Sequence, residues 1–517
     1  MAKLSVFVIL LFLHNRLIAQ GNYVANTANN STTATYGTFN TLLGTGAGSS
    51  GNMTGDRNTV TGYNAGSSLT AGQKNSFYGV DAGRFTTIGY ENTFVGVEAG
   101  LFNSSGYYNT VVGRAGGYTN TTGNSNAFVG AYAGYSNTTG SYSVFVGKDA
   151  GYYNTTGDNN NFIGITAGSH NTSGSSNNFI GSHAGGNNTT GFGNSFLGDD
   201  AGQSNQTADY NTFVGYFAGS ASTGSNNSFF GSRAGISNTT GTQNTFVGYS
   251  AGAKTTTGSN NIIIGPSSGT TITTSDDNIL MGYNVQSGGG SGSHNVIIGG
   301  EAGGGLWAGG SNTFIGHQTS AASMSLHHAT AIGADAKVTV SHAVVLGNQA
   351  NVGIGTSAPT ARIEIVSEAT DQSGLRLTNL TSHSKPSQAT DEFLTVNEQG
   401  DLVKARYQLR INSPTEWSDR VFTSGYRLCS LSAVAAYVQE NGHLPGVPSA
   451  DQVAKEGIDL VKLNTTLLEK VEELTLYSIQ QEQTNHALQV RVDELDKQHK
   501  QEIADLKKLV NQLLKKQ

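Results

Sequence analysis

The 517-residue chain is short of several residue types, and each shortage excludes a class of protein. A single cysteine, Cys429, rules out a disulfide within the chain. Charged residues make up 12% of the chain and the formal net charge is -7, which leaves no basic stripe for nucleic acid or an anionic membrane. Beyond the N-terminal region no apolar run is long enough to span a bilayer. We therefore expect no nucleic-acid partner and no transmembrane segment in the mature chain.

Glycine is abundant instead, and charge is placed unevenly. The chain has 70 Gly and only 6 Pro, a composition that without further order indicates low complexity. Residues 1–351 contain 10 of the 28 Lys and Arg and 13 of the 35 Asp and Glu. The sequence is therefore a nearly uncharged polar body followed by an ordinary charged segment.

Residues 1–20 read as a secretory signal. Lys3 precedes an apolar stretch over residues 4–13, and residues 17–20 provide a cleavage region. A buried N-terminal helix is the alternative. An exported chain with one cysteine cannot be stabilised by internal disulfides. Assembly between chains is the simplest other source of stability.

A glycine recurs about every seventeen residues over two thirds of the chain. We call these the repeat glycines, and the residues between two of them form one coil. The step is seventeen except for one step each of eighteen, sixteen and fourteen. A fixed period of this kind predicts stacked copies of one small unit. The repeat glycines are Gly44, Gly62, Gly79, Gly96, Gly113, Gly130, Gly147, Gly164, Gly181, Gly198, Gly215, Gly231, Gly248, Gly265, Gly282, Gly299, Gly316, Gly333 and Gly347.

Each coil ends in a phrase typified by Asn92-Thr93-Phe94-Val95-Gly96. The asparagine, stacked coil on coil, predicts a ladder of side-chain amides. The large apolar residue and its β-branched neighbour indicate a strand whose two faces are both apolar. Only one of the two can fill the small interior of a coil, so we expect another copy of the chain to cover the other.

The repeat has three other interpretations. A single-chain left-handed β-helix needs three apolar edges per coil, and only one is evident. A calcium-binding β-roll needs repeated Asp in its turns, and acidic residues are too sparse. The Asn-Thr-Thr-Gly turns, as at Asn137, would present rows of hydroxyls to a glycan, a matrix protein or ice, or are simple turn chemistry.

The last coils, from His328 to Gly347, contain Ala-Thr-Ala-Ile-Gly and Ala-Val-Val-Leu-Gly. They resemble the head repeat of trimeric autotransporter adhesins (YadA-like), and the longer coils of residues 40–351 look like a variant of it. The resemblance implies a homotrimer of left-handed parallel β-rolls. That family ends in a membrane β-barrel anchor, whereas this chain ends on a helical pattern.

Residues 21–39 form a lead-in to this head, and residues 352–411 give short strand signals and a hairpin turn near Gly400, so we expect a β-rich neck. In residues 412–458, Ser430 and Ser449 can cap two helices that end at Gly442 and Gly457, on either side of a His-Leu-Pro-Gly-Val-Pro turn. This segment, with the Glu-Glu-Leu-Thr-Leu-Tyr run after it, resembles a C-terminal module of exported fibre-like proteins of Gram-negative bacteria.

Residues 459–517 predict a coiled-coil stalk, with a lone amphipathic helix as the alternative. One alternating four-three register places apolar residues along a seam, with polar members in its middle. The register runs through Leu460, Asn464, Leu467, Val471, Leu474, Ser478, Gln481, Asn485, Leu488, Val492, Leu495, His499, Glu502, Leu506, Leu509 and Leu513.

No catalytic, cofactor-binding or metal-binding residues are assigned. His327-His328 and His443 lack metal-ligand spacing, and Cys429 is expected to be a buried small residue. The acidic pairs at Asp199 and Asp276 are expected to be solvated. The glycine run that begins at Gly288 has no following Lys, so it is no phosphate loop.

The sequence therefore predicts a mostly β protein with a C-terminal α segment that is not an enzyme and needs no cofactor. We expect an exported, homotrimeric surface adhesin whose partner is an extracellular matrix protein, glycan or surface. A tail-fibre-like receptor-binding protein and an ice-binding solenoid are the alternatives.

Overall fold

The computed structural model describes residues 23–25, 37–286, 292–304, 309–369, 374–376, 378, 392–406 and 418–515. The expected signal segment, residues 1–20, and most of the glycine run from Gly288 lie outside these residues. The chain folds as two compact units, residues 1–376 and 377–517, and each is described by itself.

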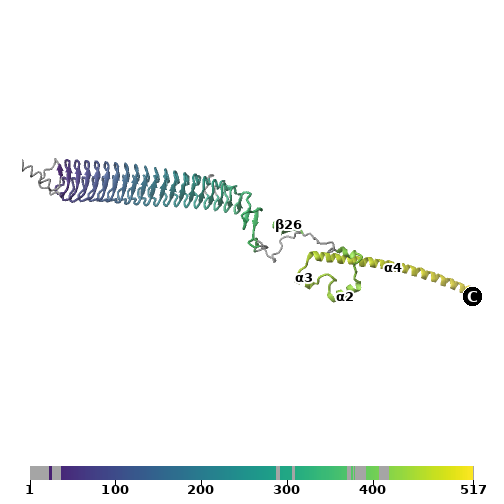
Figure 1. Ribbon diagram of the computed structural model, residues 1–517. Coiled ribbons are helices and arrows are strands. Elements are labelled where there is room, and N and C mark those ends of the chain that lie inside the picture. The colour runs from purple at the N-terminus through teal and green to yellow at the C-terminus, as the bar shows by residue number, and fades with distance from the viewer. Residues whose placement is uncertain are drawn as a thin grey trace, which may run out of the picture. The chain divides into compact units, whose positions relative to one another are not determined.

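The first unit is a parallel β-solenoid, as the repeat predicts. A 20-stranded sheet takes one short strand from each coil, and consecutive strands align as a row of arrows along the solenoid (Figure 1). The register is in phase, so that Phe179 faces Phe162 on one side and Phe196 on the other. The strands are β1 (Tyr23–Ala25), β2 (Thr41–Leu43), β3 (Thr59–Thr61), β4 (Ser76–Tyr78), β5 (Thr93–Val95), β6 (Thr110–Val112), β7 (Ala127–Val129), β8 (Val144–Val146), β9 (Asn161–Ile163), β10 (Asn178–Ile180), β11 (Ser195–Leu197), β12 (Thr212–Val214), β13 (Ser228–Phe230), β14 (Thr245–Val247), β15 (Ile262–Ile264), β16 (Ile279–Met281), β17 (Val296–Ile298), β18 (Thr313–Ile315), β20 (Thr330–Ile332) and β22 (Val344–Leu346).

A repeat glycine follows the last residue of nearly every strand of this sheet. Glycine is needed there because the next coil lies too close for a side chain. Gly96 has φ 140°, and a Cβ built on it would lie 2.4 Å from the carbonyl oxygen of Gly113. A second glycine four residues later, such as Gly100 with φ 59°, lies across the interior from the strand, where an added Cβ would lie 2.5 Å from the ring of Phe94. Both glycines are required by close approach as well as by backbone conformation.

The interior of one chain is closed by a stack of phenylalanines. Each ring lies over the ring of the neighbouring coil, with centroids 4.8 Å apart for Phe145 and Phe162 and 4.9 Å apart for Phe77 and Phe94. Strand phenylalanines such as Phe213 and Phe246 are fully buried, together with the alanine that follows most repeat glycines by three residues. The expectation that only one of the two adjoining apolar residues fills the interior is confirmed, since neighbours such as Val247 are exposed.

Asparagine ladders supply the rest of the interior. The predicted ladder, four residues before each repeat glycine, is confirmed: Asn194 donates its backbone N–H to Oδ1 of Asn177 at 3.0 Å and its Nδ2 to the carbonyl of Ala208 at 2.8 Å. A second ladder occupies the Asn-Thr-Thr-Gly turns, where Nδ2 of Asn154 lies 2.8 Å from Oδ1 of Asn137. These asparagines are buried, a placement that the turn motif did not predict.

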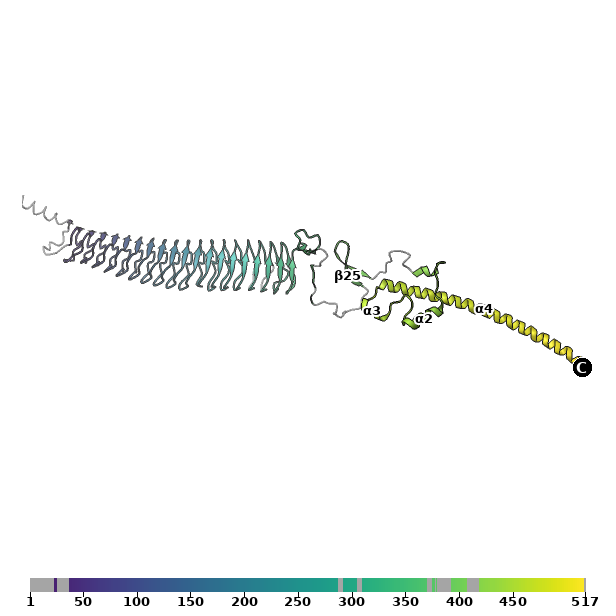
Figure 2. The same ribbon diagram turned by 60° about the horizontal axis from the view of Figure 1, so that its bottom comes forward.

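The solenoid ends in smaller pieces. Two-residue strands β19 (Ser320–Ala321) and β21 (Lys337–Val338) pair in parallel, and β23 (Val352–Ile354) pairs in parallel with β24 (Ile363–Ile365). Figure 2 shows the long row of solenoid strands from a second direction.

The second unit contains an antiparallel hairpin and helices. Strands β25 (Glu392–Val396) and β26 (Leu402–Arg406) form the predicted hairpin around residues 397–401. A 3₁₀ helix, η2 (Ser418–Phe422), comes before α2 (Leu431–Asn441), α3 (Ala450–Glu456) and α4 (Leu460–Leu514). Ser430 and Ser449 cap α2 and α3 as predicted, and Gly442 and Gly457 end them. No helix among the described residues combines the length and apolar character needed to cross a membrane.

Candidate binding surfaces

The first candidate surface is the outward side of the 20-stranded sheet, which we call the strand face. It consists of the first and third residues of each strand, typified by Thr245 and Val247 in β14. The third residue is apolar in nearly every coil. Where its side chain is exposed, the exposed fraction varies little, from 36% at Val247 to 48% at Leu346. The strand face is therefore a nearly continuous apolar row, bordered by Ser or Thr hydroxyls in many of its coils.

The second surface lies across the phenylalanine stack from the strands, and we call it the return face. Here the chain runs back five to eight residues after each repeat glycine, and its backbone bonds to the next coil, as in Phe102 N–H to Tyr118 O at 2.9 Å. The first threonine of an Asn-Thr-Thr-Gly turn also lies here. Its hydroxyl is used between coils, since Thr138 donates to the carbonyl of Thr155 at 2.9 Å.

Five consecutive coils place aromatic side chains on the return face. We call this set the aromatic ribbon; it comprises Phe85, Phe102, Tyr118, Tyr135, Tyr152 and Tyr153. Phe85 and Phe102 are stacked with centroids 4.9 Å apart, as are Tyr118 and Tyr135, and Tyr135 and Tyr152. Phe102 meets Tyr118 edge to face, at an interplanar angle of 76°. Our sequence reasoning missed this set, although its spacing is visible as aromatics five or six residues after Gly79, Gly96, Gly113, Gly130 and Gly147.

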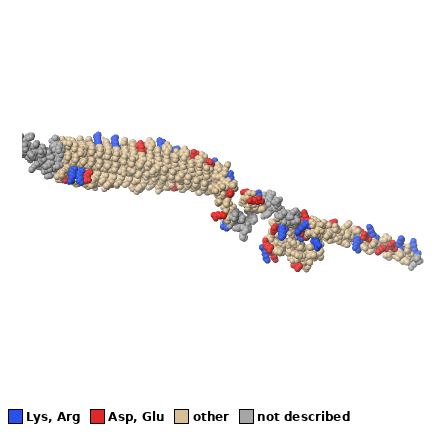
Figure 3. All heavy atoms as spheres, viewed as in Figure 1, with Lys and Arg blue, Asp and Glu red and all other residues tan. Residues whose placement is uncertain are grey.

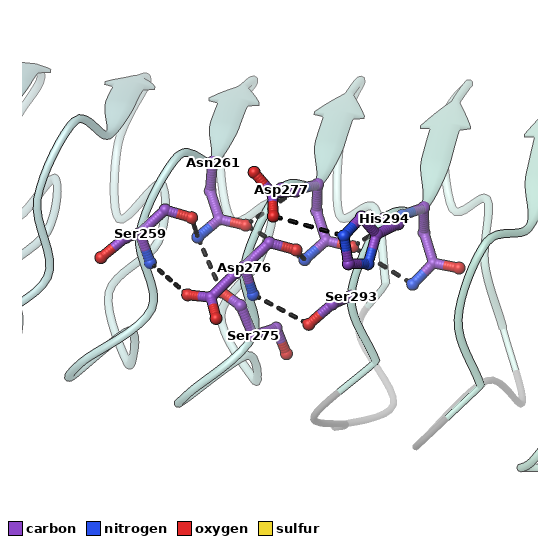
Figure 4. A network of polar contacts seen from close by, with 9 residues as sticks. Ser259, Asn261, Ser275, Asp276, Asp277, Ser293 and His294 are labelled. Carbon is purple, nitrogen blue, oxygen red and sulfur yellow. Dashed lines mark hydrogen bonds and ion pairs between the residues drawn. The ribbon is translucent and has the colours of Figure 1, made fainter.

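A third feature is a series of polar relays at the turn before the asparagine ladder. Figure 4 shows one of them: the Ser259 N–H donates to Oδ1 of Asp276 at 2.7 Å, and the Asp276 N–H donates to Oγ of Ser293 at 3.0 Å. The same alternation of Ser and Asp recurs at Ser141, where the N–H bonds Asp158. These carboxylates satisfy backbone donors of the adjoining coil, so their arrangement is structural.

The residues considered for chemistry are dispersed. Asp277 pairs with Nε2 of His294 at 3.4 Å, and Asp200 with Nδ1 of His183 at 3.6 Å, so neither acidic pair is simply solvated. His328 stacks on His342 with centroids 4.9 Å apart. Within the described ranges, no group of three or more His, Cys, Asp or Glu could hold a metal ion.

Cys429 is exposed, so the expectation that it is buried was wrong. It precedes the Ser430 cap in a segment that lies along α4, where its carbonyl accepts a hydrogen bond from the hydroxyl of Tyr477. This hydrogen bond to α4 holds the backbone at Cys429. It gives the thiol no apolar environment.

A fourth surface is the length of α4. Near its start, η2 holds it through Arg420, whose Nη2 lies 2.7 Å from Oε2 of Glu469, and through the buried Val421. The Tyr426 hydroxyl bonds Glu473 and lies 3.3 Å from Oε1 of Glu469. Burial, and then the bond to Glu473, raises the pKa of Tyr426 well above its ordinary value.

Beyond its contacts with η2 and Tyr426, α4 is exposed to solvent. Every described residue from Ser478 to Lys515 is exposed. The apolar members of the predicted seam are among the most exposed in the chain, at 63% for both Leu474 and Leu513. Charge is scattered on the solenoid surface seen in Figure 3 and denser along the helical unit.

Comparison with known proteins adds no relative. No family model matches the chain, and neither a curated protein nor a solved structure is similar to it. The functional proposal therefore rests on the strand face, the return face and the exposed length of α4, together with the sequence patterns.

Proposed function

We propose that the protein is an exported, homotrimeric fibre that works as an adhesin on the outer surface of a Gram-negative bacterium. In this arrangement the solenoid is the adhesive head and α4 forms a coiled-coil stalk with two further copies. Adhesion is multivalent: weak contacts repeated along three chains give avidity without a deep pocket.

The observation that carries the proposal is the exposed seam of α4. A 55-residue helix with apolar residues at alternating three and four spacing buries none of them in one chain. Long helices in water depend mainly on packing of an apolar face. Association of the seams of several copies supplies that packing, and the polar residues in the middle fix the register.

The number of copies and the outward location come from the resemblance of the last coils to trimeric autotransporter heads and from residues 1–20. The strand face supports the same arrangement, because its apolar row runs along the solenoid and would pack against an identical row in another copy. Since the interior of one chain is already closed, this packing would add to the stability of a coil but is not required to form it.

Light scattering coupled to size exclusion tests the assembly on the mature chain. We expect three times the mass of one chain, and a lower mass or concentration-dependent dissociation when residues 459–517 are deleted. A single species with the mass of one chain, with the solenoid folded, would overturn the proposal. Deletion that leaves trimers intact would remove the stalk from assembly and leave the strand face as the contact.

Adhesion itself is tested on cells that display the full chain. Cells should attach to a coated surface more strongly than cells that display the chain with coils deleted in multiples of seventeen residues, and attachment should fall with each coil removed. Attachment that does not depend on the solenoid would contradict its role as the adhesive head.

A further inference from the structure

The aromatic ribbon is not needed by the solenoid fold. In the two coils before it the same positions hold serines, and in the coils from Gly164 to Gly248 they hold no Phe, Tyr or Trp. Examples are Ser169, Gln203 and Ser220. These coils contribute the same three-residue strands to the sheet, so the aromatic rings are a local addition. Phe85, Phe102 and Tyr153 of the ribbon are exposed and its other three rings are half-buried. Contiguous apolar surface bordered by polar residues marks interaction sites.

We propose that the aromatic ribbon binds a linear, uncharged polysaccharide laid along the solenoid axis. The inference deepens the proposed adhesive function by naming the ligand class and its site, although the ribbon lies within one chain. In a trimer that packs through its strand faces, the return face and its ribbon would remain open to solvent.

The shape of the ribbon favours a linear ligand over a folded protein. It is one or two side chains wide, and its five coils span roughly 20 Å at the spacing of adjacent strands. A stable protein–protein interface takes about 800 Å² from each partner, which is more than so narrow a row offers. A chain-like ligand can contact every coil of the ribbon without a wider surface.

The spacing of the ribbon favours a glycan over an extended peptide. Stacked rings repeat every 4.9 Å. Side chains on one side of an extended peptide repeat about every 7 Å, so they would drift out of step with the rings. A hexopyranose unit of a linear glycan advances the chain by about the height of one coil, so one sugar can meet one ring.

The chemistry of the ribbon is neutral and amphipathic. Because the rings stack on one another, most of them present edges and hydroxyls outward, and no ribbon hydroxyl bonds another described residue. A tyrosine hydroxyl is protonated at neutral pH and can both donate and accept, and burial raises the pKa of Tyr118 and Tyr152 further from neutrality. The flanking charges have both signs: Arg84 lies 5.1 Å from the Phe85 ring and 3.4 Å from Asp81, which offers no preference for a charged ligand.

Affinity electrophoresis of the full mature chain tests the proposal, with mixed-linkage β-glucan, xylan and galactomannan as the probes. We expect at least one to retard the protein, and the triple variant Tyr118→Ser, Tyr135→Ser, Tyr152→Ser to weaken that binding at least tenfold. Serine occupies this position in other coils, so the variant should fold. The triple variant with Phe in place of Tyr should retain part of the binding; unchanged binding would overturn the role of the hydroxyls.

The matched control removes three exposed tyrosines elsewhere on the solenoid: Tyr216→Ser, Tyr249→Ser, Tyr283→Ser. Each follows a repeat glycine directly and is about half exposed. The control should bind as the unchanged protein does. An equal loss in the control, no retardation by any of the three glycans, or ribbon-dependent binding only to immobilised collagen would overturn the proposal.

The result is separable from the fibre proposal by measuring mass on the same samples. Monomers that bind a glycan through the ribbon would overturn the trimer and retain the ribbon site. Trimers that none of the three glycans retards would overturn the ribbon site and retain the trimer.

Discussion

The solenoid and the helical unit treat their apolar groups in opposite ways. Each solenoid coil places an apolar residue inside, most often a Phe that stacks on the next ring, and bonded asparagine amides line the same interior. In α4 only Glu472 is buried, and the leucines of the seam face solvent. The comparison teaches that a repeat can close its core within one chain by contact between successive coils. A long helix has no successive copy of itself to contact, so the seam of α4 stays exposed in one chain.

The largest expected effect on stability comes from placing a charge at the buried position of one strand and not at its exposed neighbour. Phe246→Asp puts a charge into the buried stack and should lower the free energy of unfolding by about 4 kcal/mol or more. The control is Val247→Asp on the strand face, one residue along. Thermal unfolding followed by circular dichroism should show a large loss for the first variant and little for the second in a monomer. If both variants unfold alike, the strand face is buried in the assembled protein, and the mass of the Val247 variant will show whether copies separate.

The next effect concerns the asparagine ladder. The amide of Asn154 bonds Asn137, Gly157 and Asn171, whereas both polar atoms of the Asn205 side chain lack a hydrogen-bond partner among the described residues. Asn154→Ala should therefore cost about 2 kcal/mol, because it leaves buried groups unsatisfied, and Asn205→Ala clearly less. Equal losses in chemical denaturation would mean that the amides fill space only.

A smaller effect tests how firmly η2 holds α4. Because the pKa of Tyr426 is raised in the folded protein, its contribution to stability is present below the ordinary phenol pKa of about 10 and is lost as pH rises through the raised value. The helical melting signal should weaken on alkaline titration. Tyr426→Phe should start lower and change less with pH; an identical pH profile would show that this hydroxyl does not anchor α4.

The smallest expected effect is a gain. Thr166 is β-branched and sits at φ 54°, two residues after a repeat glycine, where the chain elsewhere uses Asn64 and Asn284. Thr166→Asn should stabilise the solenoid by about 1 kcal/mol, since Asn tolerates this conformation better. A melting temperature that falls would mean that the side chain of Thr166 contributes more than its backbone costs.

The sequence predicted the solenoid well because its period repeats the same physical requirement. The strand triplet, the repeat glycine and the first asparagine ladder follow from residue types at fixed spacing, and the serine caps at Ser430 and Ser449 follow from local rules. The second ladder escaped prediction because asparagine is equally suited to an exposed turn, and only the direction of the chain decides which way Asn137 points.

Two further features escaped prediction for different reasons. Residues two after a repeat glycine, such as Glu98 and Phe217, adopt positive φ although their types do not indicate it, because bonding between coils imposes the backbone shape. The aromatic ribbon escaped prediction because it occurs in only five coils, whereas the repeat pattern shows only the residues that all coils share. Cys429 was misplaced because a rule for average cysteines says little about one residue next to a helix cap.

The in-phase stacking of identical coils makes the length of the solenoid adjustable. Strands stack in register along the sheet, and from Phe128 to Phe246 each central ring stacks on the next, so adding or removing one coil in this stretch recreates the same types of contact. Unequal recombination between such repeats would yield longer and shorter heads that still fold. In the proposed fibre, such a change would alter the reach of the head while the ends of the protein stay the same.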